Sequence, residues 1–346
     1  MKKSKINGLC FDDILLVPNY SEIESRHSVD LGMMIGSGKN IIELSTPVIA
    51  APMDTVCGQS MCIAMNNLGG LGILHRYMSK EEQQNISREL VESECRFGVA
   101  ISSNNDFIKQ AQALYDIGVR IFLVDTANGH GKYAIDAVRQ LRDVFDDVHI
   151  MAGNVATIDG FVNLADSGAD SVRVGIGGGS ACTTRIISGH GVPTLASIME
   201  CDTWRDLNDA FDCSIIADGG IRNSGDMVKS FAAGADAVMV GSMLAGTDES
   251  PGNIFVDASG TRVKTFRGMA SADAQRDANN VVSVAEGIST TIPYKGTVEK
   301  IISQIRGGIG SGCSYSGCDR LAQLSTFAKY VEVSNASLNE SKPHAL

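Results

Sequence analysis

The sequence predicts an α/β fold of the (β/α)8 type, that is, a TIM barrel formed by a single domain. Eight short apolar segments alternate with segments of helical periodicity. The chain has 346 residues, which exceeds the usual size of one domain but is a length that such barrels reach. An open doubly wound sheet is the alternative, and eight strand–helix units favour the closed barrel.

Each predicted strand is a short run of apolar and β-branched residues, and several runs are apolar almost throughout. This pattern is typical of parallel strands that are buried on both faces. The predicted strands are Pro47–Ala51, Leu71–His75, Arg96–Ile101, Ile121–Thr126, His149–Ala152, Ser171–Val174, Ser214–Ala217 and Ala237–Val240.

The segments between these strands carry apolar residues at helical spacing. Three of them end in similar phrases that contain Gly118, Gly168 and Gly234, and glycine at such a point is the usual C-cap of a helix. The predicted helices include Asn105–Asp116, Tyr133–Val144, Ile158–Asp166 and Ser224–Ala233.

The residues after the eighth strand predict a flap and a tail. Residues 250–292 are rich in glycine and poor in apolar periodicity, which is typical of a long mobile flap over an active site. Val298–Ile305 predicts a helix, and Leu321–Val333 predicts a last helix and strand. The barrel domain is therefore expected to span residues 1–334, followed by a disordered polar tail over residues 335–346.

Composition excludes several classes of protein. A formal net charge of −11 without a Lys/Arg-rich run argues against broad nucleic-acid binding. Neither a signal peptide nor an apolar stretch of membrane-spanning length is present, so we expect no membrane partner. Nine scattered cysteines without zinc spacing predict a cytoplasmic protein that has neither a disulfide framework nor a structural metal.

Two glycine-containing loops follow the seventh and eighth strands. They read Asp218-Gly219-Gly220 and Gly241-Ser242. Barrels often bind phosphate at this place through backbone N–H groups, which glycine lets an anion approach closely. The carboxylate of Asp218 repels phosphate, so a ribose diol is its expected partner. The alternative is that both loops are only tight turns.

A third loop, after the sixth strand, contains a candidate nucleophile. Gly177–Gly179 permits unusual backbone dihedrals, and Ser180 offers a hydroxyl to a phosphate. Cys182 follows, and positive charge from Arg185 together with the loop N–H groups favours the reactive thiolate. The sequence thus indicates covalent catalysis by Cys182 on an electrophilic carbon. The alternative is an inert buried thiol, which we expect for Cys10, Cys57, Cys62, Cys95, Cys201, Cys213, Cys313 and Cys318.

These motifs together resemble the IMP dehydrogenase/GMP reductase family. The cysteine loop reads Gly-Ile-Gly-x-Gly-Ser-x-Cys-Thr-Thr-Arg, and Gly178 stands where the family usually has proline. The resemblance extends over roughly residues 8–333. The other matching segments, in order, are Ser25-Arg26, Pro52 to Val56, Gly153-Asn154-Val155, Ala217 to Ile221, Met243 to Gly252 and Tyr294-Lys295-Gly296.

The resemblance implies a homotetramer of barrels that binds a purine nucleotide and a nicotinamide cofactor, with the Cys182 thiolate attacking C2 of the purine. It places the 5′-phosphate, the ribose and the base on three sets of residues. The 5′-phosphate lies on Ser180, Gly220, Gly241 and Ser242. The ribose lies on Asp218, and the base lies on Met269 and Ala270. The carbonyls of Gly177, Gly179 and Cys182 correspond to a monovalent-cation site, usually for potassium.

The family contains two activities that share the covalent adduct. An IMP dehydrogenase sends hydride to NAD⁺ and hydrolyses the adduct to XMP, for which a long flap supplies an Arg-Tyr pair. A GMP reductase loses ammonia and receives hydride from NADPH. It needs a proton relay, which the resemblance assigns to Thr184 and Glu286.

Two absences favour NADPH-dependent reduction of GMP to IMP. Residues 268–296 contain no Arg-Tyr pair, since Arg276 is followed by Asp277. No regulatory CBS-type insertion follows His75. The amino-acid sequences around His75 and at Gly241-Ser242-Met243 are more similar to those of dehydrogenases, so IMP dehydrogenase remains the alternative. A catalytically silent nucleotide-binding regulator is a third interpretation, and the retained Cys182 argues against it.

The resemblance also places the cofactor. Asp125 and Asn128, after the fourth strand, correspond to positions near the nicotinamide ribose. Arg76 is a candidate for the 2′-phosphate of NADPH, because arginine is suited to phosphate recognition. The alternative is that Arg76 forms a surface salt bridge.

Overall fold

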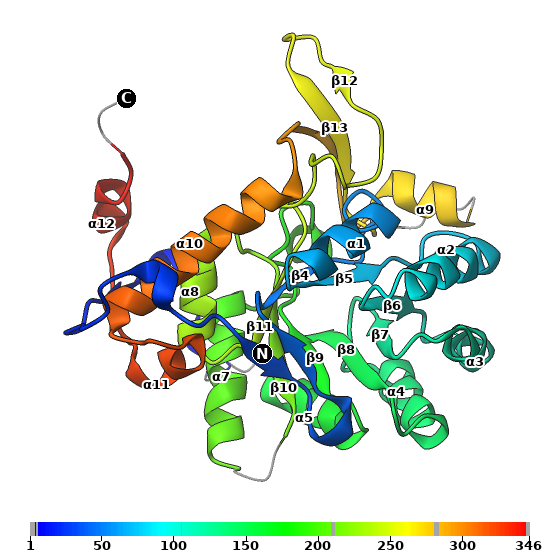
Figure 1. Ribbon diagram of the computed structural model, residues 1–346, viewed down its shortest axis with the longest axis horizontal. Helices are drawn as coiled ribbons and strands as arrows, with labels where there is room; N and C mark the ends of the chain where they lie inside the picture. The colour runs from blue at the N-terminus through cyan, green and yellow to red at the C-terminus, as the bar shows by residue number, and fades with distance from the viewer. Residues whose placement is uncertain (1–3, 5, 105, 209–211, 280–283, 344–346) are drawn as a thin grey trace.

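Eight parallel strands form a closed barrel in the structure, a computed structural model that describes residue 4 and residues 6–104, 106–208, 212–279 and 284–343 (Figure 1). Neighbouring strands pair in the order β10-β11-β4-β5-β6-β7-β8-β9. The predicted (β/α)8 fold is therefore confirmed, and the open sheet is excluded.

The predicted strands correspond one to one to the barrel strands. Ser171–Val174 and Ala237–Val240 coincide with the prediction, and the other strands differ only at their ends. The barrel strands are β4 Val48–Ala50, β5 Leu71–Leu74, β6 Phe97–Ile101, β7 Ile121–Asp125, β8 His149–Val155, β9 Ser171–Val174, β10 Ser214–Asp218 and β11 Ala237–Val240.

Helices surround the barrel and fill the connections between its strands. Gly118, Gly168 and Gly234 follow helix ends with φ of 120°, 103° and 100°, so glycine is needed there as predicted. The helices of this layer are α1 Gln59–Asn67, α2 Lys80–Glu92, α3 Phe107–Ile117, α4 Lys132–Val144, α5 Ile158–Asp166, α6 Thr184–Ile187, α7 Thr194–Asp206 and α8 Ser224–Ala232. Since β5 connects to β6 through α2 alone, the connection has no room for a CBS-type domain.

Two short antiparallel pairs flank the barrel. The pair β2 Met33–Ile35 and β3 Ile42–Leu44 packs its buried side chains against the residues inside the barrel, such as Ile73 and Met239. The pair β1 Ile14–Val17 and β15 Lys329–Glu332 joins the two ends of the chain. Short 3₁₀ turns lie at Phe11–Asp13, Arg26–Ser28, Gly38–Asn40 and Leu321–Gln323.

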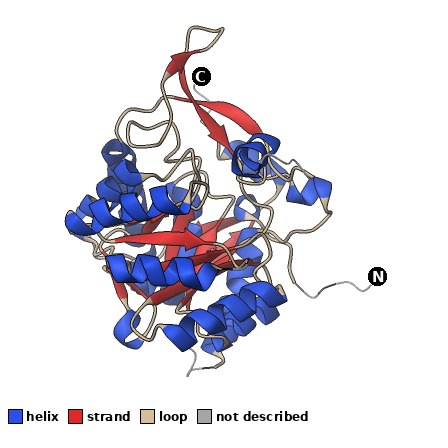
Figure 2. Cartoon of the chain, turned by 90° about the vertical axis from the view of Figure 1, so that its right-hand side faces the viewer, coloured by secondary structure: helices blue, strands red, loops and turns tan. Residues whose placement is uncertain are grey.

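The predicted flap contains a three-stranded sheet and a helix. Its strands are β12 Phe255–Val256, β13 Arg262–Arg267 and β14 Ser289–Pro293, and its helix is α9 Ala272–Asn279. Figure 2 shows this sheet projecting from one end of the barrel. The mobility of the flap stays a prediction.

The C-terminal region is more helical than the sequence indicated. Helix α10 spans Val298–Ser316 because apolar residues stay buried as far as Cys313, and Gly317 ends it with φ of 74°. Helix α11 Leu324–Phe327 follows. The tail contains helix α12 Asn335–Glu340, which Ser334 caps by accepting a hydrogen bond from Ser337 N at 3.4 Å. The disorder of residues 335–346 stays a prediction. No helix in the described part of the chain is both long and apolar enough to cross a membrane.

Candidate active site

A cavity of about 410 Å³ lies at the carboxyl ends of the barrel strands. The structure brings nearly all of the predicted site residues to it. They are Arg76, Asp125, Gly177, Gly179, Ser180, Cys182, Thr184, Asp218, Gly219, Gly220, Gly241, Ser242, Met269, Ala270 and Glu286. A wider-open hollow of about 460 Å³, lined by Lys39, Arg142 and Asp170, lies where the strands begin and contains none of them. The functional site of barrel enzymes lies at the carboxyl ends, so we assign the first cavity.

The cysteine loop runs from the end of β9 across the mouth of the barrel. Gly175 begins it with φ of 145°, and a Cβ there would lie 1.9 Å from the carbonyl oxygen of Asp218. The loop closes on itself where Cys182 N donates to Gly179 O at 3.0 Å. A Cβ at Gly178 would lie 2.8 Å from Thr194 Oγ1. This loop therefore packs directly on the backbone that follows β10.

Cys182 and Thr184 are in hydrogen-bonding contact, and a segment that contains Glu286 runs beside them. The distance from Cys182 Sγ to Thr184 Oγ1 is 3.2 Å. Thr183 N donates to Glu286 O at 2.9 Å, and Ile288 N donates to Ala181 O at 3.0 Å. The return of the flap thus adds a short strand to the cysteine loop and places Glu286 in the same cavity as the thiol and the hydroxyl.

The other cysteines of the chain differ from Cys182 in their surroundings. Burial raises the pKa of the Cys95, Cys201 and Cys313 thiols to about 12. Cys182 is partly exposed in the cavity, as a nucleophile must be. One correction concerns Cys10, which is also partly exposed rather than buried, because it lies in the N-terminal segment ahead of the barrel.

The glycine loops after β10 and β11 lie beside the cysteine loop. Gly219 and Gly220 have φ of 89° and 81°, and a Cβ at Gly219 would lie 3.2 Å from Gly179 N. After β11, Gly241 O accepts from Leu244 N and Ala245 N at 3.0 Å each, so a helical turn begins there. The first N–H groups of such a turn have no partner within it and can bind an anion.

A buried arginine, Arg173 on β9, joins two carboxylates of the site. Its Nη2 lies 2.9 Å from Asp218 Oδ2, and its Nη1 lies 2.8 Å from Asp125 Oδ1. Asn154 Nδ2 also donates to Asp218 Oδ2 at 2.7 Å. Burial disfavours the charges of Arg173 and Asp125, yet the mutual attraction outweighs it, so the pKa of Arg173 is raised and that of Asp125 lowered.

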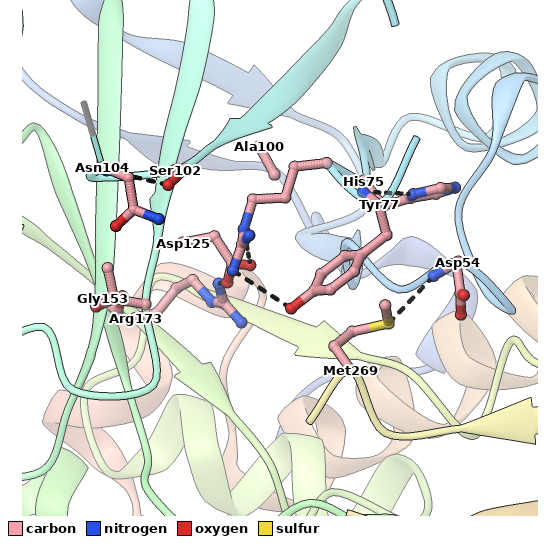
Figure 3. Close-up of polar contacts among 12 residues, drawn as sticks. Asp54, His75, Tyr77, Ala100, Ser102, Asn104, Asp125, Gly153, Arg173 and Met269 are labelled. Atoms are coloured by element: carbon pink, nitrogen blue, oxygen red, sulfur yellow. Dashed lines mark hydrogen bonds and ion pairs between the residues drawn. The ribbon is translucent and has the colours of Figure 1, made fainter. Parts of the chain in front are cut away.

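Arg76 completes this network on the other side of Asp125. Its Nε lies 3.2 Å from Asp125 Oδ2, and its guanidinium lies 4.7 Å from the ring centre of Tyr77. Figure 3 shows Tyr77, Asp125 and Arg173 turned toward one another. Arg76 thus forms a salt bridge, as the alternative expected, but within the cavity. Its contact with a cofactor phosphate stays a prediction.

The flap lines the cavity and contacts the loop after β4. Arg267, at the end of β13, pairs with Asp54 in the loop after β4, with Nε at 2.9 Å from Oδ2. Asp54 N donates to Met269 Sδ at 3.4 Å (Figure 3). These contacts hold Met269 and Ala270 over the cavity, where sequence comparison had expected base-contacting residues.

Asn128 is the predicted residue that the structure does not bring to the cavity. It lies in an exposed turn ahead of α4, where its Oδ1 accepts from His130 N at 3.2 Å. The chain turns away there because Gly129 N donates to Asn154 O at 2.7 Å. Its contact with a cofactor stays a prediction.

From the sequence alone, Arg173 was overlooked and no role was given to Asn154 and Asp54, although these two lie in segments that carry the family resemblance. Arg173 had a signal, because it is the one charged residue in the buried strand Ser171–Val174, between two valines. A buried charge requires partners, and the aspartates at neighbouring strand ends were available.

Comparisons with known proteins agree with this geometry. Residues 8–344 match the family model described as the IMP dehydrogenase / GMP reductase domain. The inosine-5′-monophosphate dehydrogenase of Cryptosporidium parvum is 34% identical, covering 97% of this chain and 95% of the relative. The GMP reductase of Leishmania major is 30% identical, covering 97% and 96%.

A solved structure gives the same result. A variant of GMP reductase from Trypanosoma brucei in complex with guanosine 5′-monophosphate superposes with a TM-score of 0.90. The identity is 28%, and 98% of each chain is covered. By its barrel, its cysteine loop and these matches along nearly the whole chain, the protein belongs to the IMP dehydrogenase/GMP reductase family of oxidoreductases.

Proposed function

We propose that this protein is a GMP reductase, which converts GMP to IMP and ammonia with NADPH through a covalent bond between Cys182 and C2 of the purine. The observation that carries the proposal is the 3.2 Å contact between Cys182 Sγ and Thr184 Oγ1 in a cavity that also contains Glu286. Residues 268–296 contain no Arg-Tyr pair to activate water. The relative from Leishmania major and the solved GMP complex support the same assignment.

The nucleotide would lie across the mouth of the barrel. Ser180, Gly220, Gly241 and Ser242 would hold the 5′-phosphate through a hydroxyl and N–H groups. Asp218 would accept the ribose hydroxyls through Oδ1, because Arg173 and Asn154 both bind its Oδ2. Met269 and Ala270 would contact the base from the flap. Each of these residues lines the cavity, with Gly219 between two of them.

The side chains around C2 would then carry the reaction. The Cys182 thiolate adds to C2, and the C2 amino group leaves as ammonia with a proton from the Thr184 hydroxyl. Glu286 then returns a proton to Thr184. When bound, NADPH supplies the hydride that C2 receives. The C–S bond then breaks, and its electron pair returns to Cys182. Over one cycle, GMP, NADPH and two protons give IMP, ammonium and NADP⁺.

The residues present fit a cofactor and a cation. Arg173 and Arg76 hold Asp125 ionised, so it would accept hydrogen bonds from the ribose hydroxyls of a nicotinamide nucleotide. Arg76 would be a further contact in the cavity, and Asn128 would contact the cofactor from outside it. For potassium, the carbonyls of Gly177, Gly179 and Cys182 are the donors. Gly179 O accepts only Cys182 N within the loop and keeps a lone pair for a cation, which would order the loop.

The proposal extends to the assembly and the compartment. We expect a homotetramer in the cytoplasm, so sedimentation should give four times the chain mass of 36.6 kDa. A stable monomer that retains full activity would contradict this expectation.

IMP dehydrogenase is the second candidate function. Several relatives carry that name, including one from Nitrosopumilus maritimus at 31% identity over 97% of this chain. That alignment runs over 475 positions, more than the 346 residues of this chain, so the relative contains a segment that this chain lacks.

A paired assay distinguishes the two functions. The purified protein is incubated with GMP and NADPH in one reaction and with IMP and NAD⁺ in the other, and the absorbance of the reduced cofactor is followed. Oxidation of NADPH with release of ammonia supports the reductase. Formation of NADH and XMP, without consumption of NADPH, would establish a dehydrogenase.

A further inference from the structure

The segment Tyr294-Lys295-Gly296 has no role in the proposed reaction, yet its lysine contacts the site. Lys295 Nζ donates to the carbonyl oxygen of Ser242 at 2.5 Å and to that of Met243 at 3.2 Å. These two carbonyls belong to the helical turn that begins at Gly241 after β11. The ammonium group therefore lies behind the loop proposed to bind phosphate.

The geometry of the turn that begins at Gly241 shows which N–H groups the contacts of Lys295 orient. In a trans peptide the carbonyl and the next N–H point to opposite sides. Because Leu244 N and Ala245 N both donate to Gly241 O, the N–H groups of Ser242 and Met243 lead the turn, at the end that attracts anions. The carbonyl of Ser242 shares a peptide with Met243 N–H, and the carbonyl of Met243 shares one with Leu244 N–H. Both carbonyls accept from Lys295, so the lysine fixes the orientation of the leading Met243 N–H and of the peptide that follows it.

The backbone around Lys295 is itself fixed to the same loop. Lys295 N donates to Gly246 O at 2.9 Å, and Asp248 N donates to Gly296 O at 2.9 Å. Tyr294 Oη donates to Asp248 Oδ1 at 2.7 Å. These three hydrogen bonds join the end of the flap to the loop after β11 and hold the ammonium group in place.

We propose that Lys295 is a positioning residue for the 5′-phosphate of the nucleotide. It acts without touching the phosphate, by holding the Ser242–Met243 and Met243–Leu244 peptides in line and by adding a positive charge behind them. The protein has a net charge of −11, so a local cation matters for an anionic ligand. This inference rests on the proposed function, since it assumes a nucleotide that carries a phosphate.

The charged side chains near Lys295, which are Asp248, Glu249 and Lys264, each bind another group. On the loop, Asp248 binds Tyr294 and Glu249 accepts from Val298 N at 2.8 Å. On β13, Lys264 Nζ donates to Thr247 O at 2.8 Å and to Ser250 O at 2.6 Å. Burial lowers the pKa of Lys295 to about 8. The ammonium form therefore dominates at neutral pH and is lost above it.

Three variants test the proposal by binding alone. Lys295→Met removes the charge, Lys295→Arg keeps it, and Lys264→Met is the matched control, because Lys264 holds two carbonyls farther along the same loop. Dissociation constants for GMP are measured by calorimetry, and those for guanosine by competition. Thermal unfolding verifies that each variant is folded.

Lys295→Met should weaken GMP binding about tenfold while guanosine binding changes by less than about twofold. Lys264→Met should leave the preference for GMP over guanosine unchanged. In the wild type, GMP binding should weaken as the pH rises through about 8, because the neutral amine is favoured there. Lys295→Arg should keep its affinity over this range, since arginine stays charged.

The inference is overturned if Lys295→Met weakens GMP and guanosine equally, if Lys264→Met has the same effect, or if Lys295→Arg follows the wild-type pH profile. Should Lys295→Met fail to fold, the pH comparison of Lys295→Arg with the wild type decides. A wild-type protein that binds neither GMP nor IMP refutes the proposed function instead, whatever the variants do.

Discussion

Thr184 is the residue through which a proton would reach the leaving amino group, since its hydroxyl lies 3.2 Å from the nucleophile. Thr184→Val keeps the shape of the side chain but removes the hydroxyl. We expect kcat for GMP reduction to fall by about 10²- to 10⁴-fold, the usual worth of a positioned proton donor. KM for GMP should change little, because the hydroxyl is not a phosphate or ribose contact. Thr184→Ser is the matched control and should keep most of the activity.

Steady-state kinetics at several pH values test this role. A Thr184→Val enzyme that retains the wild-type kcat would show that the proton comes from elsewhere.

His75, at the end of β5, should make the protein sensitive to acid. Burial lowers the pKa of His75 to about 4, and its Nδ1 accepts from Tyr77 N at 3.2 Å, a bond that the protonated ring loses. The folded protein thus keeps the ring neutral, whereas the unfolded chain takes up a proton below about pH 6.5. Stability should therefore fall as the pH drops from 6.5 toward 4, by up to about 3 kcal/mol.

Urea unfolding between these pH values measures the effect. His75→Asn keeps an acceptor for Tyr77 N but cannot take up a proton, so its stability should fall less over this range. Parallel pH profiles for the two proteins would contradict the assignment.

At the residue scale, the sequence predicted the side chains that belong to short contiguous motifs. Cys182, Asp218 and the glycine loops were found because strand ends and glycines mark them locally. Arg173 was missed because its role depends on two aspartates that lie 48 and 45 residues away in the chain. Asn128 was placed in the site by position after the fourth strand, and the turn that its Asn-Gly dipeptide forms takes it away from the cavity.

One ion pair between the flap and the barrel is largely buried. Arg267 on β13 binds Asp54 and Asp277, whose side chains are 12% and 63% exposed. Asp54→Asn leaves a largely buried guanidinium without its inner charge partner, which we expect to cost about 3 kcal/mol of stability. The matched change Asp277→Asn removes an exposed partner of the same arginine and should cost less than about 0.5 kcal/mol.

Chemical denaturation of both variants gives the comparison. Equal losses would show that the inner pair does not secure the flap.

At the scale of elements, strands were predicted more accurately than the regions after them. Ala237–Val240 is apolar throughout, as is usual for a strand buried on both faces. Ser171–Val174 was recognised from its two valines, although Ser171 and Arg173 in it are polar. Helix α10 exceeded its predicted end because glycines and serines interrupt its apolar pattern, while tertiary packing buries Ile309 and Cys313 all the same. The tail forms α12 through a local cap that the polar composition concealed.

For the whole molecule, the closed barrel explains why distant loops form one site. Parallel strands direct their carboxyl ends to the same rim, so the loops after β9, β10 and β11 meet there. The contacts between Gly179 and Gly219 show how closely these backbones approach. Overall negative charge is compatible with an anionic substrate because N–H groups and Lys295 create a local positive region.

An isotope experiment shows directly whether hydride reaches C2 of a purine that is bound to Cys182. The protein is incubated with GMP and NADPH that carries deuterium at the transferred position, and the products are analysed by mass spectrometry. We predict IMP with deuterium at C2, one ammonia per NADPH consumed, and no product from Cys182→Ala, whereas Cys201→Ala remains active. Unlabelled IMP or an active Cys182→Ala enzyme would contradict hydride transfer to a purine bound to Cys182. Formation of XMP from IMP and NAD⁺, without any reaction of GMP with NADPH, would contradict the reductase function.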